Sequence, residues 1–286
     1  MFKNKLYLYI KLMRLDRPVG IFLLLCPPFW VITYLCEGGI NNIISLIFLI
    51  GVITTRTIGC VVNDFFDKKY DIRVARTKER PYASDLVSKK EVLLIFFLLA
   101  ILNISLLYFL NLKTIILALA AIFLIITYPL TKRFFIAPQF FLGITFAIST
   151  LMAYTAITNM YPDFLVWVFF FATVIWVTMF DTIYAISDKV DDLKIGINST
   201  AILFGEMDKF MIAVLQIIFY TIFVYIGYIQ EYGYSFFSFL VLAIVVGVYN
   251  QILIKHKKSE SYMNAFKNNQ YVGFLIFMGI YGEYII

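Results

Sequence analysis

Runs of about 20 apolar residues recur along the whole chain, and they constrain its fold more than any other feature. A helix of about 20 apolar residues crosses the hydrocarbon core of a bilayer. Nine such runs are present, at roughly 18–36, 43–62, 91–110, 114–131, 138–158, 163–186, 209–229, 234–254 and 268–286. Only 15% of the residues are charged, against about 25% in an average soluble domain. The sequence therefore predicts an all-α integral membrane protein built as a nine-transmembrane-helix bundle.

The basic residues are distributed unevenly between the connections of these runs. All but Lys113 and Arg56 of the 24 Lys and Arg residues lie in the N-terminal segment or in the connections after the second, fourth, sixth and eighth runs. The positive-inside rule assigns such connections to the cytoplasm. The N-terminus is therefore predicted to be cytoplasmic and the C-terminus to lie outside. This placement accounts for the net charge of +6, so no nucleic-acid partner is expected.

Cysteine and histidine give no sign of a soft-metal or redox site. Cys26, Cys36 and Cys60 lie in or beside apolar runs without metal-ligand spacing, and the single histidine, His256, lies in a basic connection. Cysteines in such places behave as small hydrophobic residues. The N-terminus is basic and interrupted by charge, so no cleavable signal peptide is expected. Haem ligation and a histidine proton relay are therefore disfavoured.

Two clusters of acidic residues follow apolar runs on the predicted cytoplasmic side. The first aspartate cluster is Asn63, Asp64, Asp67 and Asp71, and the second aspartate cluster is Asp188, Asp191 and Asp192. Spacings of three and four place the members of each cluster on one helical face. Neighbouring carboxylates resist ionisation unless a cation is present, and Mg²⁺ prefers oxygen ligands and bridges carboxylates to phosphates. The clusters predict a Mg²⁺ site for a diphosphate carried on a lipid.

A plainer interpretation is that each cluster is a solvated helix end. Lys68, Lys69 and Arg73 would then neutralise the first cluster, and Gly196 would end the helix of the second. A matching cluster on the same side of the membrane makes this interpretation the weaker one.

Two further charges lie seven positions before cluster members. Arg56 precedes Asn63 and Asp181 precedes Asp188 by this spacing, which is two helical turns or about 10 Å deeper into the membrane. Buried charges in a membrane span face a cavity or each other. Arg56 and Asp181 are predicted to bind a small aromatic or anionic substrate, the alternative being a structural ion pair. The parallel also indicates one membrane domain with two weakly similar halves, 1–136 and 137–286, whose clusters face each other.

Basic side chains near the clusters are candidates for binding the diphosphate. Tyr128, Lys132 and Arg133 lie at the end of the fourth run, and Lys194 lies beside the second cluster. Such groups bind phosphate oxygens, although each is also accounted for as a positive-inside anchor. The stretch 64–88 is predicted to form a long loop that covers the site as a lid, with Arg80 as a further diphosphate ligand.

The motifs Asn63-Asp64-x2-Asp67-x3-Asp71, Tyr128-x3-Lys132 and Asp188-x3-Asp192 together resemble the signature of the UbiA-type intramembrane aromatic prenyltransferases. Segments 12–20, 56–71, 181–205 and 268–280 resemble its 4-hydroxybenzoate polyprenyltransferase branch, so the resemblance covers nearly the whole chain. It implies a bundle in a bacterial inner membrane around a central cavity open to lipid, with the active site facing the cytoplasm. It also implies two Mg²⁺ ions, held by Asn63, Asp67 and Asp71 on one side and by Asp188 and Asp192 on the other.

The resemblance implies a reaction as well. A polyprenyl diphosphate would donate its chain to 4-hydroxybenzoate at the ring carbon ortho to the hydroxyl, as in ubiquinone biosynthesis. The sequence contains no evident Ser–His or Cys–His pair, which favours ionisation of the allylic diphosphate. Asp67 and Asp71 would act through the metal, and Lys132 and Lys194 would stabilise the leaving group. Arg56 is expected to pair with the acceptor carboxylate, and Asp181 or Asp191 to accept a proton.

Two other functions stay open at this point. One alternative is a different acceptor in the same reaction class, such as homogentisate or haem, although the branch-specific segments disfavour this. Another is a cation-coupled transporter that uses the aspartates as cation sites. The outer connections hold few acidic residues, which gives a transported cation no acidic path. A non-catalytic lipid-binding protein would leave the two metal-type clusters without a purpose.

Overall fold

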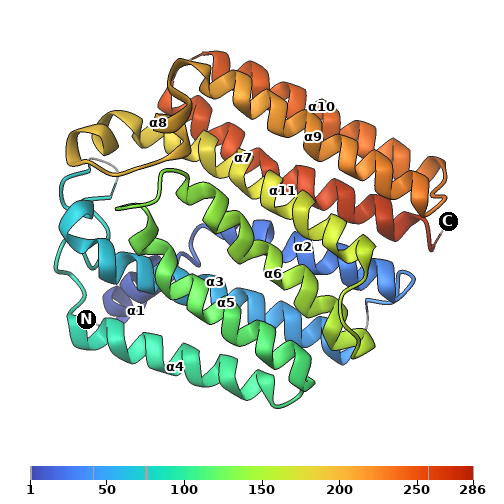
Figure 1. The fold of residues 1–286 in the computed structure, drawn as a ribbon. Helices are drawn as coiled ribbons and strands as arrows, with labels where there is room; N and C mark the ends of the chain where they lie inside the picture. The colour runs from blue at the N-terminus through green and yellow to red at the C-terminus, as the bar shows by residue number, and fades with distance from the viewer. Residues whose placement is uncertain (1, 41, 75–76, 257, 286) are drawn as a thin grey trace.

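The apolar runs form long helices that pack into one bundle (Figure 1). The computed structural model describes residues 2–40, 42–74, 77–256 and 258–285, and these contain helices and no β-strand. The helices are α1 (Phe2–Leu12), α2 (Val19–Leu35), α3 (Ile43–Asp71), α4 (Lys89–Leu107), α5 (Leu112–Thr131), α6 (Pro138–Thr158), α7 (Phe164–Ile195), α8 (Thr200–Phe204), η1 (Gly205–Met207), α9 (Asp208–Ile229), α10 (Tyr234–Lys255) and α11 (Ser259–Gly282). The two ends of the chain lie at opposite ends of the bundle (Figure 1).

Each predicted apolar run coincides with a helix. Within the described ranges, seven segments are long and apolar enough to cross a membrane, namely α3, α4, α5, α6, α7, α10 and the segment 200–229 that contains α9. The apolar helix α2 has 17 residues, and α11 carries polar residues along its first turns. These findings support an integral membrane protein, while the count of nine crossings stays a prediction.

Three predicted boundaries were wrong, all at polar ends of helices. Helix α3 continues to Asp71 and α7 to Ile195, and α11 begins at Ser259 instead of 268. The predicted lid therefore begins after Asp71. Hydropathy marks where a helix leaves the apolar layer, whereas backbone hydrogen bonds continue wherever charges at i and i+4 are compatible with a helix. The aspartates thus stand on rigid helical turns.

Helix α7 lies at the centre of the bundle and packs against α6, α9 and α11. A β-carbon on Gly143 of α6 would lie 2.7 Å from the carbonyl oxygen of Val174, so glycine permits the close approach of α6 and α7. Fully buried aromatic rings fill the core beside α7, including Trp30, Trp176 and Phe219, with the Trp176 and Phe219 rings stacked at 6.0 Å. This packing makes α7 a firm support for the second aspartate cluster.

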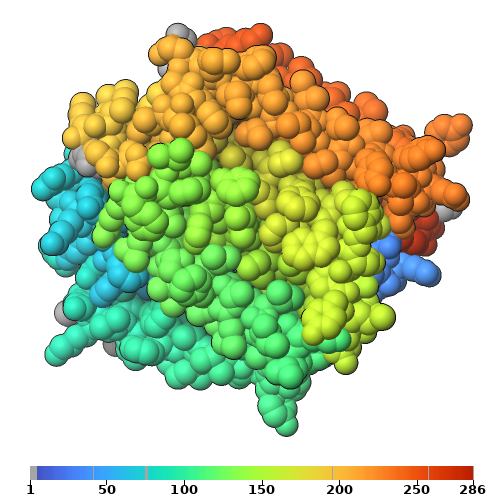
Figure 2. Space-filling view, in the orientation of Figure 1, coloured from blue at the N-terminus to red at the C-terminus, as the bar shows by residue number. Residues whose placement is uncertain are grey.

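Helix α4 lies at the edge of the bundle and packs chiefly against α3 (Figure 1). Only 6% of its most apolar 18-residue stretch is buried inside the protein. The helix exposes the side chains of Leu94, Phe97, Leu98 and Ile101. Figure 2 shows the side of the molecule on which α4, α5, α6 and α9 reach the surface. In a membrane protein, apolar side chains exposed as on α4 contact lipid.

Candidate functional site

The first aspartate cluster occupies the last turns of α3, at the end of the bundle where α7 also ends, here called the acidic end. Asp64, Asp67 and Asp71 are 1%, 9% and 7% exposed, and Asn63 is half-buried. Buried carboxylates remain charged only beside cations or hydrogen-bond donors. The groups that surround these three side chains therefore determine whether the carboxylates are charged.

Two arginines from distant parts of the sequence bind this cluster. Arg14, between α1 and α2, donates from Nη2 to both carboxylate oxygens of Asp64 at 2.8 and 3.1 Å. Arg80, in the connection between α3 and α4, donates from Nη1 to Asp64 Oδ1 at 3.1 Å and to Asp71 Oδ2 at 2.8 Å. The predicted lid is thereby folded down onto α3.

The connection between α5 and α6 brings two more cations to the cluster. Lys132 Nζ and an Arg133 Nη2 each lie 3.9 Å from an oxygen of Asp67. Arg133 also donates to the carbonyl oxygen of Phe66 at 3.3 Å and lies over the ring of Tyr70. Ion pairs at 3.9 Å are looser than the hydrogen-bonded pairs of Asp64, so the Asp67 carboxylate keeps coordination sites for another cation.

The second aspartate cluster is more open to solvent. Asp188, Asp191 and Asp192 are all half-buried on the last turns of α7. Lys194 Nζ lies 3.8 Å from Asp191, but the Lys194 side chain is 71% exposed. The Ser187 hydroxyl lies within 3.4 Å of Asp188. Exposed pairs of this kind contribute little free energy, so the pair of Lys194 and Asp191 adds little to the stability of this cluster.

Backbone contacts join the second cluster to the α5–α6 connection. After α7 the chain turns back, and the Asn198 N–H donates to the carbonyl oxygen of Lys132 at 2.9 Å. The Thr200 N–H donates to the buried side chain of Gln139 at 2.7 Å. Lys132 is therefore fixed between the two clusters by contacts to both halves of the chain.

Charges from both clusters act on Lys132. Burial by itself would lower the pKa of its ammonium group, but Tyr128, Asp67, Asp181 and Asp192 outweigh burial and hold that pKa above its ordinary value. Lys132 is therefore a permanent cation. Asp67 and Asp192 come from different clusters, and both raise the pKa of this one ammonium group, which supports the prediction that the two clusters belong to one site.

The donor set fits a hard divalent cation. The amide of Asn63 and the carboxylates of Asp67, Asp71, Asp188 and Asp192 offer oxygen, which Mg²⁺ prefers, and no sulfur or imidazole. In the part of the chain that the structure describes, no three acidic, histidine or cysteine side chains already converge as a metal centre. A cation here would thus share its coordination with a ligand that spans the clusters, as Mg²⁺ commonly does with phosphates.

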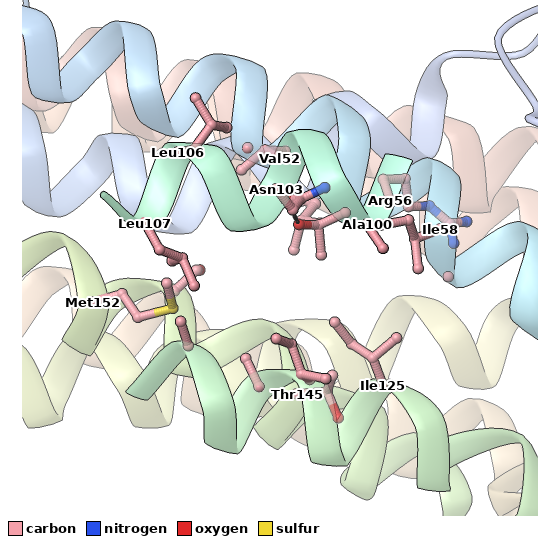
Figure 3. A pocket seen from close by; sticks show the side chains of 18 of the residues that line it. Val52, Arg56, Ile58, Ala100, Asn103, Leu106, Leu107, Ile125, Thr145 and Met152 are labelled. Atoms are coloured by element: carbon pink, nitrogen blue, oxygen red, sulfur yellow. Dashed lines mark hydrogen bonds between the residues drawn. The ribbon is translucent and has the colours of Figure 1, made fainter. Parts of the chain in front are cut away.

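An apolar cavity of about 310 Å³ lies between α3, α4, α5 and α6 (Figure 3). Arg56 and Tyr128 line it at the acidic end, and Leu106, Leu107 and Met152 line the far end. Its lining is apolar apart from a few groups such as Asn103, whose amide oxygen accepts a hydrogen bond from Thr55 at 3.0 Å. The cavity suits a hydrocarbon chain whose polar end reaches the clusters.

The Arg56 guanidinium lies directly against the backbone of Gly20 in α2. A β-carbon on Gly20 would overlap the Nε, Nη2 and Cζ atoms of Arg56. Because glycine has no side chain, the guanidinium of Arg56 can occupy the space beside Gly20. Neither this role of Gly20 nor the contact of Arg14 with Asp64 was predicted, although both residues lie in the segment 12–20 that carries part of the family resemblance.

The structure thus brings the predicted site residues together to different degrees. Lys132 interacts electrostatically with four of the predicted residues, namely Asp67, Tyr128, Asp181 and Asp192. Arg56 in turn interacts electrostatically with Tyr128. Arg80 and Arg133 reach the first cluster. Asp64 is bound by two arginines, and Lys194 points largely into solvent beside Asp191. The metal, substrate and catalytic roles of all these residues stay predictions.

Comparison with known proteins gives consistent matches. Residues 24–277 match the model of the UbiA prenyltransferase family. The 4-hydroxybenzoate octaprenyltransferase of Coxiella burnetii (strain CbuK_Q154) is 43% identical over 272 residues, covering 95% of this chain and 94% of that protein. The enzyme of the same name from Vesicomyosocius okutanii subsp. Calyptogena okutanii (strain HA) is 44% identical over 268 residues, covering 94% and 98%.

Solved structures share the fold at lower identity. The apo structure of a UbiA homolog from Aeropyrum pernix K1 superposes with a TM-score of 0.78 at 22% identity, covering 90% of this chain and 96% of that one. A UbiA homolog from Archaeoglobus fulgidus bound to GPP and Mg²⁺ gives a TM-score of 0.67 at 17% identity, covering 94% and 99%.

Proposed function

The chain belongs to the UbiA prenyltransferase family, and we propose that it transfers a polyprenyl group from a polyprenyl diphosphate to 4-hydroxybenzoate. The new bond forms at the ring carbon ortho to the hydroxyl, diphosphate is released, and the product serves ubiquinone biosynthesis. The observation that carries this proposal is the identity of more than 40% with 4-hydroxybenzoate octaprenyltransferases over nearly the full length of both chains. The names of these relatives favour an octaprenyl donor.

Mg²⁺ is the proposed cofactor. Asn63, Asp67 and Asp71 would hold it on one side of the site, and Asp188 and Asp192 on the other. The oxygen-only donor set supports this assignment. The structure of the UbiA homolog from Archaeoglobus fulgidus, which is bound to GPP and Mg²⁺, supports it as well. When bound, the metal neutralises the charge of the diphosphate and of the departing pyrophosphate.

The donor would lie with its chain in the apolar cavity and its diphosphate at the acidic end. Tyr128 lines the cavity, and Lys132, Arg133 and Arg80 adjoin the first cluster. These groups would donate hydrogen bonds to the diphosphate oxygens, where charge-assisted bonds are strongest. Lys194 is more exposed, so its contribution would be smaller.

The chemical step follows from this arrangement. The carbon–oxygen bond of the allylic diphosphate breaks, and its electron pair leaves with the pyrophosphate, which Lys132 stabilises as charge develops. Arg56 pairs with the acceptor carboxylate and aims the ring at the allylic cation. The ring carbon ortho to the hydroxyl attacks, and Asp181 or Asp191 accepts the proton that restores aromaticity.

We further propose that the bundle crosses a bacterial cytoplasmic membrane nine times with its acidic end in the cytoplasm. Exposed basic residues gather at this end, including Lys69, Lys89, Lys90 and Arg133, as the positive-inside rule requires of cytoplasmic connections. Membrane lipid then surrounds the apolar faces of the helices and delivers the polyprenyl substrate.

Prenyl transfer in isolated membranes tests the proposal. Radiolabelled 4-hydroxybenzoate and octaprenyl diphosphate are supplied with Mg²⁺ or with EDTA, and lipid-soluble label is counted. A labelled product that EDTA abolishes is the expected result. No product across several donor chain lengths, with a control enzyme active, would exclude 4-hydroxybenzoate as the acceptor. Product with labelled homogentisate instead would reassign the acceptor within the same reaction class.

A further inference from the structure

We propose that Asp64 and Arg14 are positioning residues that hold Arg80 over the first aspartate cluster, from where Arg80 passes from Asp71 to a diphosphate oxygen when the donor binds. The inference rests on the proposed function for the identity of the diphosphate. The anchoring of Arg80 itself is a property of the chain without ligand. In this proposal the role of Asp64 differs from that of Asp67, although both residues belong to one motif.

The surroundings of Asp64 favour this part over metal binding. Its side chain is 2% exposed and accepts three hydrogen bonds, two from Arg14 and one from Arg80. A metal ion at Asp64 would have to displace at least one guanidinium from a buried carboxylate, which is costly. Asp67, by contrast, has its cations at 3.9 Å. The two carboxylates are therefore differently available to a metal.

Two of the contacts that hold Arg80 differ in kind. One acceptor, Asp64, is fully enclosed, and the other, Asp71, belongs to the proposed metal ligands. A cation bound to Asp71 competes with Arg80 for the same negative charge and loosens that contact. The bond to Asp64 is untouched, so Arg80 stays at the site. The Nη1 N–H released from Asp71 then suits a phosphate oxygen.

Arg14 is built into its position. Its backbone adopts φ 58°, uncommon for a residue with a side chain, and its Nη1 donates to the carbonyl oxygen of Lys11 in the last turn of α1 at 3.0 Å. The neighbouring Leu12 packs with Val61 of α3 and with Tyr82 and Val87 of the loop that carries Arg80. Helix α1, α3 and the loop thus form one packed unit around the pair of Arg14 and Asp64.

Kinetics of Asp64→Asn and Arg14→Gln separate positioning from metal binding. Both variants are expected to raise the KM for polyprenyl diphosphate about 10-fold, as loss of a charge-assisted bond does. The Mg²⁺ concentration at half-maximal rate should stay within about twofold of the parent value, since neither change removes a ligand in this proposal. Arg17→Gln is the matched control, because Arg17 is 79% exposed and pairs with Asp16 instead. A large rise in the Mg²⁺ requirement for Asp64→Asn alone would make Asp64 a metal ligand and overturn the proposal.

Amide hydrogen exchange supplies a readout that needs no activity. In the protein without metal or substrate, residues 77–88 should exchange faster in Asp64→Asn and in Arg14→Gln than in the parent, and at the parent rate in Arg17→Gln. Unchanged exchange in Arg14→Gln would refute the anchoring. If the protein proved to prenylate no aromatic acceptor, the exchange rates would still test whether Asp64 and Arg14 anchor the loop that carries Arg80. Arg14→Gln also serves as the second variant if Asp64→Asn fails to fold.

Discussion

The two aspartate clusters carry similar residues at similar spacing, yet the structure holds them in different ways. In the first, Asp64 and Asp71 are hydrogen-bonded to arginines from the α1–α2 and α3–α4 connections, and Asp67 faces Lys132. In the second, the aspartates are half-buried at the end of α7, and Lys194 pairs loosely with Asp191. The first cluster is thus hydrogen-bonded to arginines from two connections, whereas the second lies half-buried on the last turns of a firmly packed helix.

The difference between the two aspartate clusters indicates that they have different roles. A cluster already compensated by protein cations needs no metal to be stable, so its cations can move to the diphosphate while its carboxylates take the metal. A half-buried cluster on a firmly packed helix can exchange a hydrated ion with solvent. We therefore expect the sites to differ in what their neighbours contribute, although both are needed for the reaction.

The largest expected effect is loss of an aspartate from either cluster. Asp67→Ala and Asp192→Ala should each lower kcat/KM for prenyl transfer by at least about 10³-fold, because each removes a proposed metal ligand from the leaving-group site. Asp163→Asn at the far end of α7 is the control, since asparagine can keep the cap on the Val166 N–H. If Asp192→Ala kept activity within about 10-fold of the parent, the two clusters would not form one site.

Removal of the cation between the clusters should come next. Lys132→Ala is expected to lower kcat by about 10²–10³-fold, because its ammonium group is proposed to stabilise charge that develops as the diphosphate leaves. Steady-state assays at saturating substrate measure this effect. Lys113→Ala, at the other end of α5, should leave kcat unchanged. A rise in KM with unaltered kcat would mean that Lys132 binds the substrate and the transition state equally, without lowering the barrier of the chemical step.

A smaller and more selective effect is expected at Gly20. The added methyl group in Gly20→Ala pushes the Arg56 guanidinium from its place but meets only the tip of a flexible side chain. The KM for 4-hydroxybenzoate should rise about 10-fold as a charge-assisted contact is lost, and the KM for polyprenyl diphosphate should change little. The melting temperature should not fall, because alanine favours helix over glycine. Equal changes in both KM values would contradict the assignment of Arg56 to the acceptor.

The smallest expected effect concerns the cation beside the second cluster. Lys194→Gln should change kcat/KM less than about threefold, because an exposed ion pair contributes little. The same assay that reports on Lys132 measures it. An effect as large as that of Lys132→Ala would show that Lys194 moves into the site when substrate binds, and the contrast between the clusters would narrow.

Much of the fold was predictable because apolar runs of membrane-spanning length have one stable form, the helix. The aspartate clusters were found because each is local in sequence, with members within nine residues of one another. The contact of Arg14 with Asp64, across 50 residues, and of Lys132 with the Asn198 backbone depend on how helices pack. Amino-acid spacing does not contain that information. The same limit applies to Gly20, whose importance lies in the guanidinium beside it.

The position of α4 at the edge of the bundle has a consequence for how the protein should be handled. Because α4 lines the cavity but packs chiefly against α3, we expect acyl chains of the surrounding bilayer to complete the wall beside α4. The substrate chain and the lipids would then compete for the same space, and the bilayer would act as a structural component of the catalyst. Acyl-chain length and order in a nanodisc should therefore alter turnover in a protein whose amino-acid sequence is unchanged.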